Sequence, residues 1–449
     1  AAAGPPSTQV GPGGEGGPEP GLVPIPGSPP DPTRLPAGCA FRPRCRYADL
    51  AGERAAREVP TLRPTGEPGH LVACHLSESD LLRHRPASGG PPPPADARPP
   101  GGAWGGPGEV LLRVTGLTRH FPVRGGRSRW PLGTGWPAVR AVDGLDFEVR
   151  AGETLGLVGE SGCGKTTTVL GILRLLPPGG RVVGGQVWFD GEDLLGLDGR
   201  ALRTFRWTRL SLVFQGAMNA MNPVRTIGDQ IAEAVRLHAP ETSRAEADQR
   251  VGELLERVGI GRQRAADYPH TYSGGMRQRA MIAIALSCRP SLLIADEPTT
   301  ALDVTVQAQI LDLLARIQQQ TGMALVFITH NLGIVSEIAD RTLVMYAGEV
   351  VESVPASELF ERPRMPYTAA LLQSLPRLGA DRQGAGRLPV IPGNVPSPSA
   401  LPPGCRFHPR CAHHVAQVCD TGRPLLEPCA ADHWVRCYRW REVWPEEAA

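Results

Sequence analysis

The chain contains a single lysine, Lys165, which stands in a glycine-rich stretch suited to binding phosphate. The other basic residues among its 47 lysines and arginines are arginines. A compact ammonium can reach between the phosphates of a nucleotide, where a planar guanidinium fork fits poorly. The stretch matches the P-loop pattern, with four residues between two glycines and Lys-Thr directly after the second. The predicted phosphate-binding residues are Gly159, Glu160, Ser161, Gly162, Cys163, Gly164, Lys165, Thr166 and Thr167.

The residues on either side of this stretch predict the elements that must hold it. An apolar run from Thr154 to Val158 predicts a buried strand, and the apolar stretch from Val169 to Leu176 predicts a helix. Main-chain N–H groups at the start of that helix favour an anion, and the hydroxyl of Thr166 can bind Mg²⁺. A glycine-rich turn with an incidental lysine is the alternative. The strand–loop–helix context favours a nucleotide-binding site.

Five further motifs follow the P-loop at intervals. Paired acids end the apolar run SLLIADEP, glutamine stands in SLVFQGAMN, and histidine ends ALVFITH. The turns YSGGM and ALD precede predicted helices. Taken alone, single residues have simpler explanations. Gln215 could be a surface amide, Asp303 a helix N-cap and His330 a histidine at the end of a strand. The residues singled out are Gln215, Ser273, Gly274, Gly275, Asp296, Glu297, Asp303 and His330.

Composition limits the classes of partner. The formal net charge is +2, so no overall field favours nucleic acid or an anionic membrane surface. No run approaches the 18 apolar residues of a membrane span, and no signal pattern opens the chain, which favours a cytosolic location. Ten cysteines in a reducing compartment are expected as ligands or buried thiols. The chain does not begin with methionine, so we expect a processed, truncated or fragmentary protein.

A sequence repeat links the two ends of the chain. Ile25–Cys45 and Ile391–Cys411 align without gaps and share 13 of 21 residues. Of the four cysteine positions in the second copy and the residues after it, the first copy has the first, second and fourth, which are Cys39, Cys45 and Cys74. It has no cysteine at the third position, near Gly52, so we expect an incomplete site there. We interpret this copy, at 25–76, as the tail of an upstream unit in a tandem protein. Residues 1–24 are predicted to be disordered, and 77–108 to form a Pro/Gly-rich linker.

The ordered set of motifs resembles the ATP-binding cassette (ABC) ATPases of membrane transporters. The resemblance implies an α/β fold over 109–364, with a RecA-like P-loop core, an antiparallel β subdomain and a helical signature subdomain at about 222–290. It also implies that two such domains enclose ATP between them. The P-loop of one domain then faces Ser273, Gly274 and Gly275 of the other.

This resemblance also implies roles for single residues. Phe121 would stack on adenine, and Asp303 is counted with the nucleotide-binding residues. Thr166, Gln215 and Asp296 would order Mg²⁺. The proposed catalytic residues are Glu297, which would polarise the attacking water, His330, which would contact the γ-phosphate, and Gln215, which would couple the site to a permease.

The chain resembles one branch of this family, the ATPases of oligopeptide and dipeptide importers, over about Val110 to Trp440. The resemblance rests on PYTAALL followed by GCRFHPRC. It implies a second ATPase domain, two transmembrane permease subunits and an extracytoplasmic solute-binding protein as partners. It also implies a peripheral position on the cytoplasmic face of the plasma membrane and the import of peptides, with no nucleic acid partner.

The cysteines of the tail, predicted at 365–449, leave several interpretations open. Cys405, Cys411, Cys419 and Cys437 match positions that hold an iron–sulfur cluster in some members of the family. Their spacing is C-x5-C-x7-C-x17-C, which is not a standard signature, so it is compatible with a four-iron cluster, with zinc and with free thiols. The cargo could also be nickel or another small solute. A soluble ABC ATPase of ribosomes or DNA repair, and a regulatory role for the first copy, are competing hypotheses.

Overall fold

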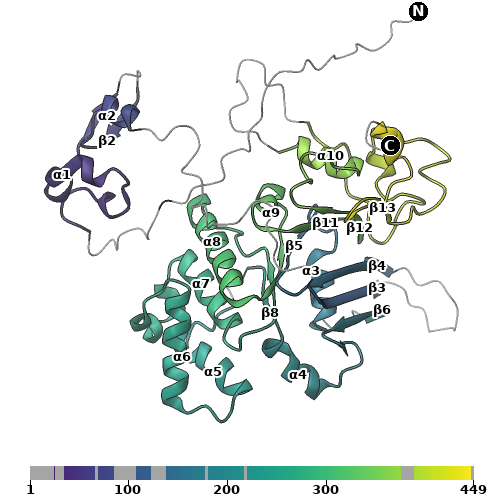
Figure 1. Cartoon of the computed structure of the whole chain (residues 1–449), viewed down its shortest axis with the longest axis horizontal. Coiled ribbons are helices and arrows are strands. Elements are labelled where there is room, and N and C mark those ends of the chain that lie inside the picture. Colours follow the sequence, from purple (N-terminus) through teal and green to yellow (C-terminus); the bar gives the residue numbers. More distant parts are fainter. Residues whose placement is uncertain are drawn as a thin grey trace, which may run out of the picture. The chain divides into compact units, whose positions relative to one another are not determined.

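The computed structural model describes residues 25, 35–65, 69–84, 108–122, 138–176, 181–216, 220–375 and 389–445. The chain divides into two compact units, Ala1–Ala103 and Trp104–Ala449, which are described separately (Figure 1). The predicted disordered segment 1–24 and most of the predicted linker lie outside the described residues. Within the described part of the chain, no helix combines the length and hydrophobicity needed to cross a membrane.

The first unit is a small module built around a hairpin. Strands β1 (Leu62–Pro64) and β2 (Leu71–Ala73) pair antiparallel. They follow the short 3-10 helix η1 (Arg42–Arg44) and helix α1 (Ala48–Arg57). Helix α2 (Glu78–Arg83) lies inside the range 77–108 that we predicted as linker, so secondary structure extends beyond residue 76.

The second unit is built on an eight-stranded sheet. Its order is β13–β14–β12–β11–β5–β10–β9–β8, and the five strands from β11 to β8 run parallel. All residues of β5, β9 and β10 are buried, which explains their continuous apolar sequences. The bounds are β5 (Thr154–Val158), β8 (Leu210–Val213), β9 (Leu292–Asp296), β10 (Ala324–Ile328), β11 (Arg341–Tyr346), β12 (Glu349–Pro355), β13 (Glu427–Ala430) and β14 (His433–Val435).

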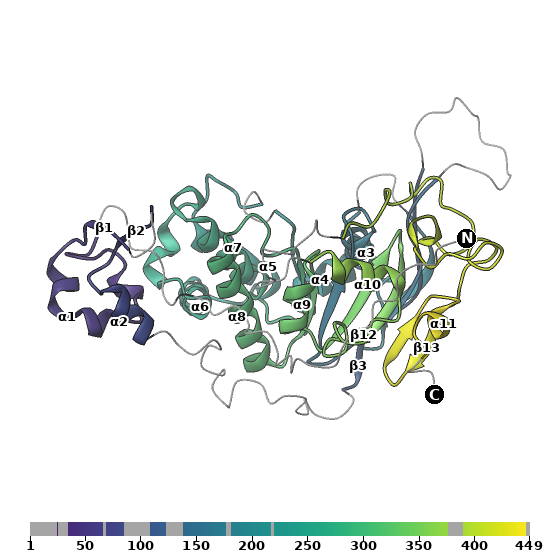
Figure 2. The ribbon, with the colours of Figure 1, turned by 90° about the horizontal axis from the view of Figure 1, so that it is seen from above.

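A four-stranded antiparallel sheet lies on one side of this unit (Figures 1 and 2). Its order is β4–β3–β6–β7, and β3 pairs with both β4 and β6. The predicted strands at 110–114 and 145–149 lie within β3 and β4. The bounds are β3 (Val110–Pro122), β4 (Ala138–Arg150), β6 (Arg181–Phe189) and β7 (Glu192–Asp193).

Helices α5 to α7 gather on the other side of the second unit (Figures 1 and 2). They share one hydrophobic core with the inner face of α8 and with β9 and β10. This arrangement confirms the predicted α/β fold with an antiparallel β part and a helical part. The helices are α3 (Lys165–Ile172), α4 (Gly199–Thr208), α5 (Ile227–His238), α6 (Arg244–Arg257), α7 (Gly274–Ala285), α8 (Val304–Thr321), α9 (Leu332–Ile338), α10 (Pro366–Gln373) and α11 (Trp440–Val443).

The C-terminal tail is an integral part of the second unit. Its hairpin β13–β14 extends the main sheet, with Glu352 of β12 opposite Val435 of β14. Phe407 and Trp440 pack in one buried cluster with Tyr346 and Tyr367. The tail is therefore folded onto the sheet that carries the P-loop.

Candidate functional site

The P-loop connects the end of β5 to the start of α3, as the sequence predicted. Gly159 and Gly164 have φ angles of 148° and 107°, which glycine adopts at little cost. A side chain would also collide with the backbone, because a Cβ would lie 2.2 Å from the Met345 carbonyl oxygen at Gly159 and 2.4 Å from that of Ala141 at Gly164. The conformation and the space both require glycine at these two positions.

Lys165 is the first residue of α3 and is only 7% exposed. Its Nζ donates to the carbonyl oxygens of Gly159 at 2.7 Å and Glu160 at 3.2 Å, so the ammonium lies inside the loop. The Cys163 thiol lies beside it and is fully buried, and burial raises the pKa of this thiol. Cys163 is therefore a small filler of the loop rather than a reactive thiolate.

Asp296, the last residue of β9, lies beside the P-loop helix. Burial raises the pKa of Asp296, and the nearby Thr166 hydroxyl acts in the opposite direction. One carboxylate oxygen, Oδ1, is buried and has no hydrogen-bond partner among the described residues. A hydroxyl and an unpaired carboxylate oxygen are donors that suit a hard cation such as Mg²⁺.

Glu297 follows directly and is held by three side chains. Gln215 Nε2 and Thr300 Oγ1 donate to Oε2 at 3.0 and 2.9 Å, and His330 Nδ1 lies 3.2 Å from Oε1. Partial burial alone would raise the pKa of Glu297, but the hydrogen bonds of His330 and Thr300 outweigh it and hold the pKa below its usual value. The structure thus brings together three of the residues predicted from separate motifs and adds Thr300, which the sequence analysis did not single out.

The SGG turn begins helix α7. Ser273 is its N-cap and accepts from the Met276 N–H at 3.3 Å. A Cβ on Gly275 would lie 2.6 Å from a methyl carbon of Val306, so close packing of α7 on α8 requires glycine there. Asp303 caps α8 by accepting from the Val306 N–H at 3.0 Å, which is the simpler of the two roles expected for it.

Phe121 lies near the end of β3 and is partly exposed. The guanidinium carbon of Arg119, two residues earlier, lies 5.8 Å from the centre of the Phe121 ring. Arg119 is only 2% exposed, so it supports the ring from within the protein. The stacking of Phe121 on adenine stays a prediction.

Four cysteines of the tail line one small cavity: Cys405, Cys411, Cys419 and Cys437. Cys429 is not among its lining residues. Burial raises the pKa of Cys405 to about 12 and of Cys437 to about 11, so these thiols are protonated at neutral pH in the absence of a cation. In the described ranges, no group of three or more His, Cys, Asp or Glu side chains is arranged to hold a metal ion.

The first copy of the repeat has the same local fold as the tail. Cys39 N–H donates to Ala55 O at 3.0 Å, as Cys405 N–H donates to Cys419 O at 2.8 Å. By this hydrogen bond the position equivalent to Cys419 is Ala55 and not Gly52, since the first copy has two more residues between this position and the second cysteine. The copy still lacks the third cysteine, as predicted.

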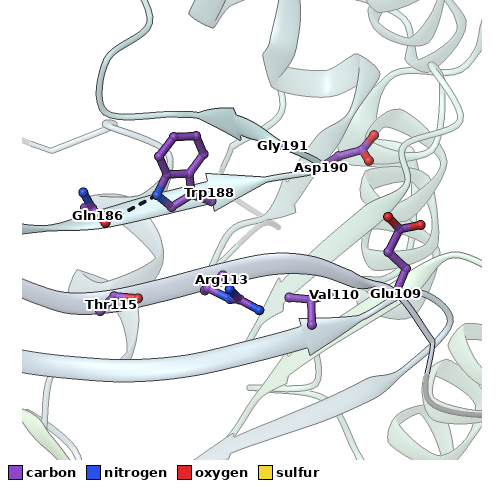
Figure 3. A pocket seen from close by; sticks show the side chains of 8 residues that line it. All are labelled: Glu109, Val110, Arg113, Thr115, Gln186, Trp188, Asp190 and Gly191. Atoms are coloured by element: carbon purple, nitrogen blue, oxygen red, sulfur yellow. Dashed lines mark hydrogen bonds between the residues drawn. The ribbon is translucent and has the colours of Figure 1, made fainter.

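An open pocket lies on the antiparallel sheet (Figure 3). The indole of Trp188 stands over β6, and its Nε1 donates to Gln186 Oε1 at 3.5 Å. Arg113 and Glu109 line the same pocket from β3 and the residue before it. None of the lining residues belongs to the predicted nucleotide site, so we assign the pocket no role in ATP chemistry.

Comparison with known proteins identifies two family regions along the chain. The model of the ABC transporter family matches residues 142–300. The model of the oligopeptide/dipeptide transporter C-terminal region matches twice, at 15–50 and 351–419, which confirms that both ends carry the same module. A solved bacterial ABC transporter cassette in dimeric form covers 55% of this chain and 99% of its own length, with 25% identity and a TM-score of 0.48.

Two curated relatives cover most of the second unit. A Brucella ovis protein named as a peptide import ATP-binding protein is 52% identical over 317 residues, which are 68% of this chain and 93% of the relative. A Sinorhizobium fredii protein named as a peptide ABC transporter ATP-binding protein is 50% identical over 338 residues. These residues are 75% of this chain and 96% of the relative. The chain therefore belongs to the ABC transporter family, as an ATP-binding cassette ATPase whose tail matches the C-terminal region of oligopeptide and dipeptide transporters.

Proposed function

We propose that this protein hydrolyses ATP to drive the import of oligopeptides or dipeptides through a membrane permease. The observation that carries the choice of cargo is the tail, which matches the oligopeptide/dipeptide transporter region and is folded onto the P-loop sheet. The names of the curated relatives support the same cargo. Import of nickel or of another small solute is one competing hypothesis. An ATPase function away from the membrane is the other.

Each residue near the loop has a proposed part in the reaction. Lys165 and the loop N–H groups bind the triphosphate, and Asp296, Thr166 and Gln215 hold Mg²⁺, which neutralises phosphate charge when bound. Glu297 accepts a hydrogen bond from the attacking water and orients it toward the γ-phosphate. His330 contacts the γ-phosphate. Its Nδ1 also holds Oε1 of Glu297 in place.

We further propose that two cassettes form the complete site. Ser273, Gly274 and Gly275 begin α7 in the helical part, whereas the P-loop lies between β5 and α3. The N-terminus of α7 offers N–H groups to an anion, so it can bind the phosphates held by a second cassette. Two permease subunits and an extracytoplasmic binding protein would complete the assembly, with the ATPase peripheral on the cytoplasmic face.

The proposal for the cysteines is an iron–sulfur cluster in the tail. Its support is that the four predicted residues line one cavity while Cys429 does not. Thiolates are the ligands that such clusters use. Among the described residues no group of three or more His, Cys, Asp or Glu side chains is arranged to hold a metal ion, which favours neither the cluster nor zinc.

The first test is recovery of the full-length protein from its native membranes in mild detergent, followed by mass spectrometry. Two permease subunits and a solute-binding protein are the expected partners. A peptide bound to that binding protein would support the proposed cargo, and nickel or a sugar bound there would replace it. Recovery of ribosomal or DNA repair proteins without a permease would refute the transport function while leaving the ATPase assignment intact.

A further inference from the structure

The tail contacts the P-loop through an ion pair between residues 250 positions apart. Arg410 donates from Nη1 to Oε2 of Glu160 at 2.7 Å and from Nη2 to Oε1 at 3.1 Å. The Arg410 side chain is 5% exposed and that of Glu160 is 27% exposed. A bidentate pair that is largely shielded from water fixes orientation as well as distance.

A second tail-side contact holds the backbone of the same residue. The Glu160 N–H donates to the hydroxyl of Tyr367, which lies in the first turn of α10 and is completely buried, at 3.0 Å. Burial raises the pKa of Tyr367, so its hydroxyl stays protonated. Glu160 is therefore held at its main chain and at its carboxylate by residues that follow the cassette in sequence.

The tail side of this contact is itself rigid. The rings of Tyr346, Tyr367 and Phe407 pack with centroid distances of 4.6 to 5.3 Å. Arg410 Nη1 also donates to Tyr346 Oη at 3.3 Å, and its Nε donates to Pro392 O at 2.9 Å. The guanidinium thus has a fixed position before any nucleotide is present.

The tail reaches the loop by a second route, through Arg406. Arg406 donates to the carbonyl of Ala347 and pairs with Asp143. The next residue after Ala347, Gly348, donates its N–H to the carbonyl of Cys163 in the P-loop at 2.9 Å. Two tail arginines therefore support the two halves of the loop.

We propose that Arg410 and Tyr367 are positioning residues that set the affinity of the P-loop for ATP by fixing Glu160. The reason is electrostatic as well as geometric. Glu160 places a carboxylate in the loop assigned to the triphosphate, and an uncompensated charge there would repel the ligand. Arg410 neutralises this carboxylate, and Tyr367 keeps the loop backbone in place. This inference rests on the proposed nucleotide site and extends it to the tail.

The test is a double-mutant cycle on the full chain with a fluorescent mant-ATP probe and steady-state phosphate release. We expect R410M to raise the Kd for mant-ATP about tenfold while kcat at saturating ATP stays within about twofold. In an E160Q background, where no charge needs compensation, R410M should change Kd by less than about twofold. R410K should restore part of the affinity, because it keeps the charge.

Controls separate this role from simple loss of folding. Arg441 is a tail arginine whose exposed ion pair with Glu427 does not involve the loop, so R441Q should leave Kd unchanged. Y367F removes the hydroxyl that accepts from the Glu160 N–H and should raise Kd while the chain stays folded at the assay temperature. The inference would be overturned if R410M lowered the affinity for mant-ATP equally in the wild-type and E160Q backgrounds, or if it left Kd unchanged. Failure of the wild-type chain to bind mant-ATP would instead refute the proposed nucleotide site.

Discussion

The side-chain amide of Gln215 donates to Oε2 of Glu297 at 3.0 Å across 82 positions of sequence. His330 lies on the opposite oxygen at 3.2 Å. The three residues follow the ends of three parallel neighbours in the sheet, β8, β9 and β10, so the sheet fixes their separation. The carboxylate is therefore oriented before ATP arrives, which is what a base that positions water requires.

The first prediction concerns Glu297 itself. Glu297→Gln should lower kcat for ATP hydrolysis at least about 100-fold, because an amide cannot accept a proton from water. The Kd for ATP should stay nearly unchanged, since the loop and Lys165 are untouched. Phosphate release and mant-ATP titration measure the two quantities. Glu361→Gln, at an exposed position, is the matched control, and undiminished hydrolysis in Glu297→Gln would exclude it as the base.

A second prediction follows from the lowered pKa of Glu297. Because the ionised carboxylate is the active form, activity should be lost only as the pH falls through this lowered pKa. Thr300→Val removes a hydrogen bond that favours the charged form, so the pKa should rise and the acid limb of the kcat profile should move to higher pH. Thr321→Val, whose hydroxyl bonds within α8, is the control. An acid limb that moves to lower pH would contradict the prediction.

The third prediction separates binding from chemistry. Lys165→Ala removes the ammonium held among the loop carbonyls and should weaken ATP binding about 10- to 100-fold, the range expected for a lost charged hydrogen bond. The fluorescence of mant-ATP measures this directly. Lys165→Arg should not rescue affinity, because the guanidinium is too large for the buried position of Nζ. Full affinity in either variant would argue against this loop as the phosphate site.

Much of the site could be predicted from the sequence because its motifs are local. The P-loop joins a buried strand to a helix within a few residues, and its glycines indicate positive φ angles. Asp296 and Glu297 likewise follow a continuous apolar run, which forms β9. Residues at the carboxyl ends of neighbouring parallel strands meet at one sheet edge, so their grouping followed from the motifs.

The contacts made by the tail could not be predicted in this way. Arg410 and Glu160 belong to motifs that are each complete without the other, and nothing in either indicates a partner 250 positions away. Their contact depends on the docking of the tail against Tyr346 and Tyr367. Thr300 was missed for a similar reason, because a threonine that follows a catalytic motif carries no pattern of its own.

The last prediction concerns the cysteine cavity. Protein purified without oxygen should contain about four iron and four sulfide ions per chain and show visible charge-transfer absorption. Cys411→Ser should abolish this absorption, because it removes a residue that lines the cavity. Cys429→Ser is the matched control, since Cys429 donates to His433 O and does not line the cavity.

The four-iron proposal fails if the wild-type chain contains zinc or no metal under the same conditions. If the wild-type chain and Cys429→Ser contain zinc and Cys411→Ser does not, the cavity forms a single-ion site after movement of the tail. The first copy supplies an internal comparison, because Ala55 replaces its third cysteine. Metal that persists in Cys411→Ser but disappears on changing Cys39 or Cys45 would place the site in the first unit instead. The tail is the expected location, since it alone has four cysteines around one cavity among the residues described.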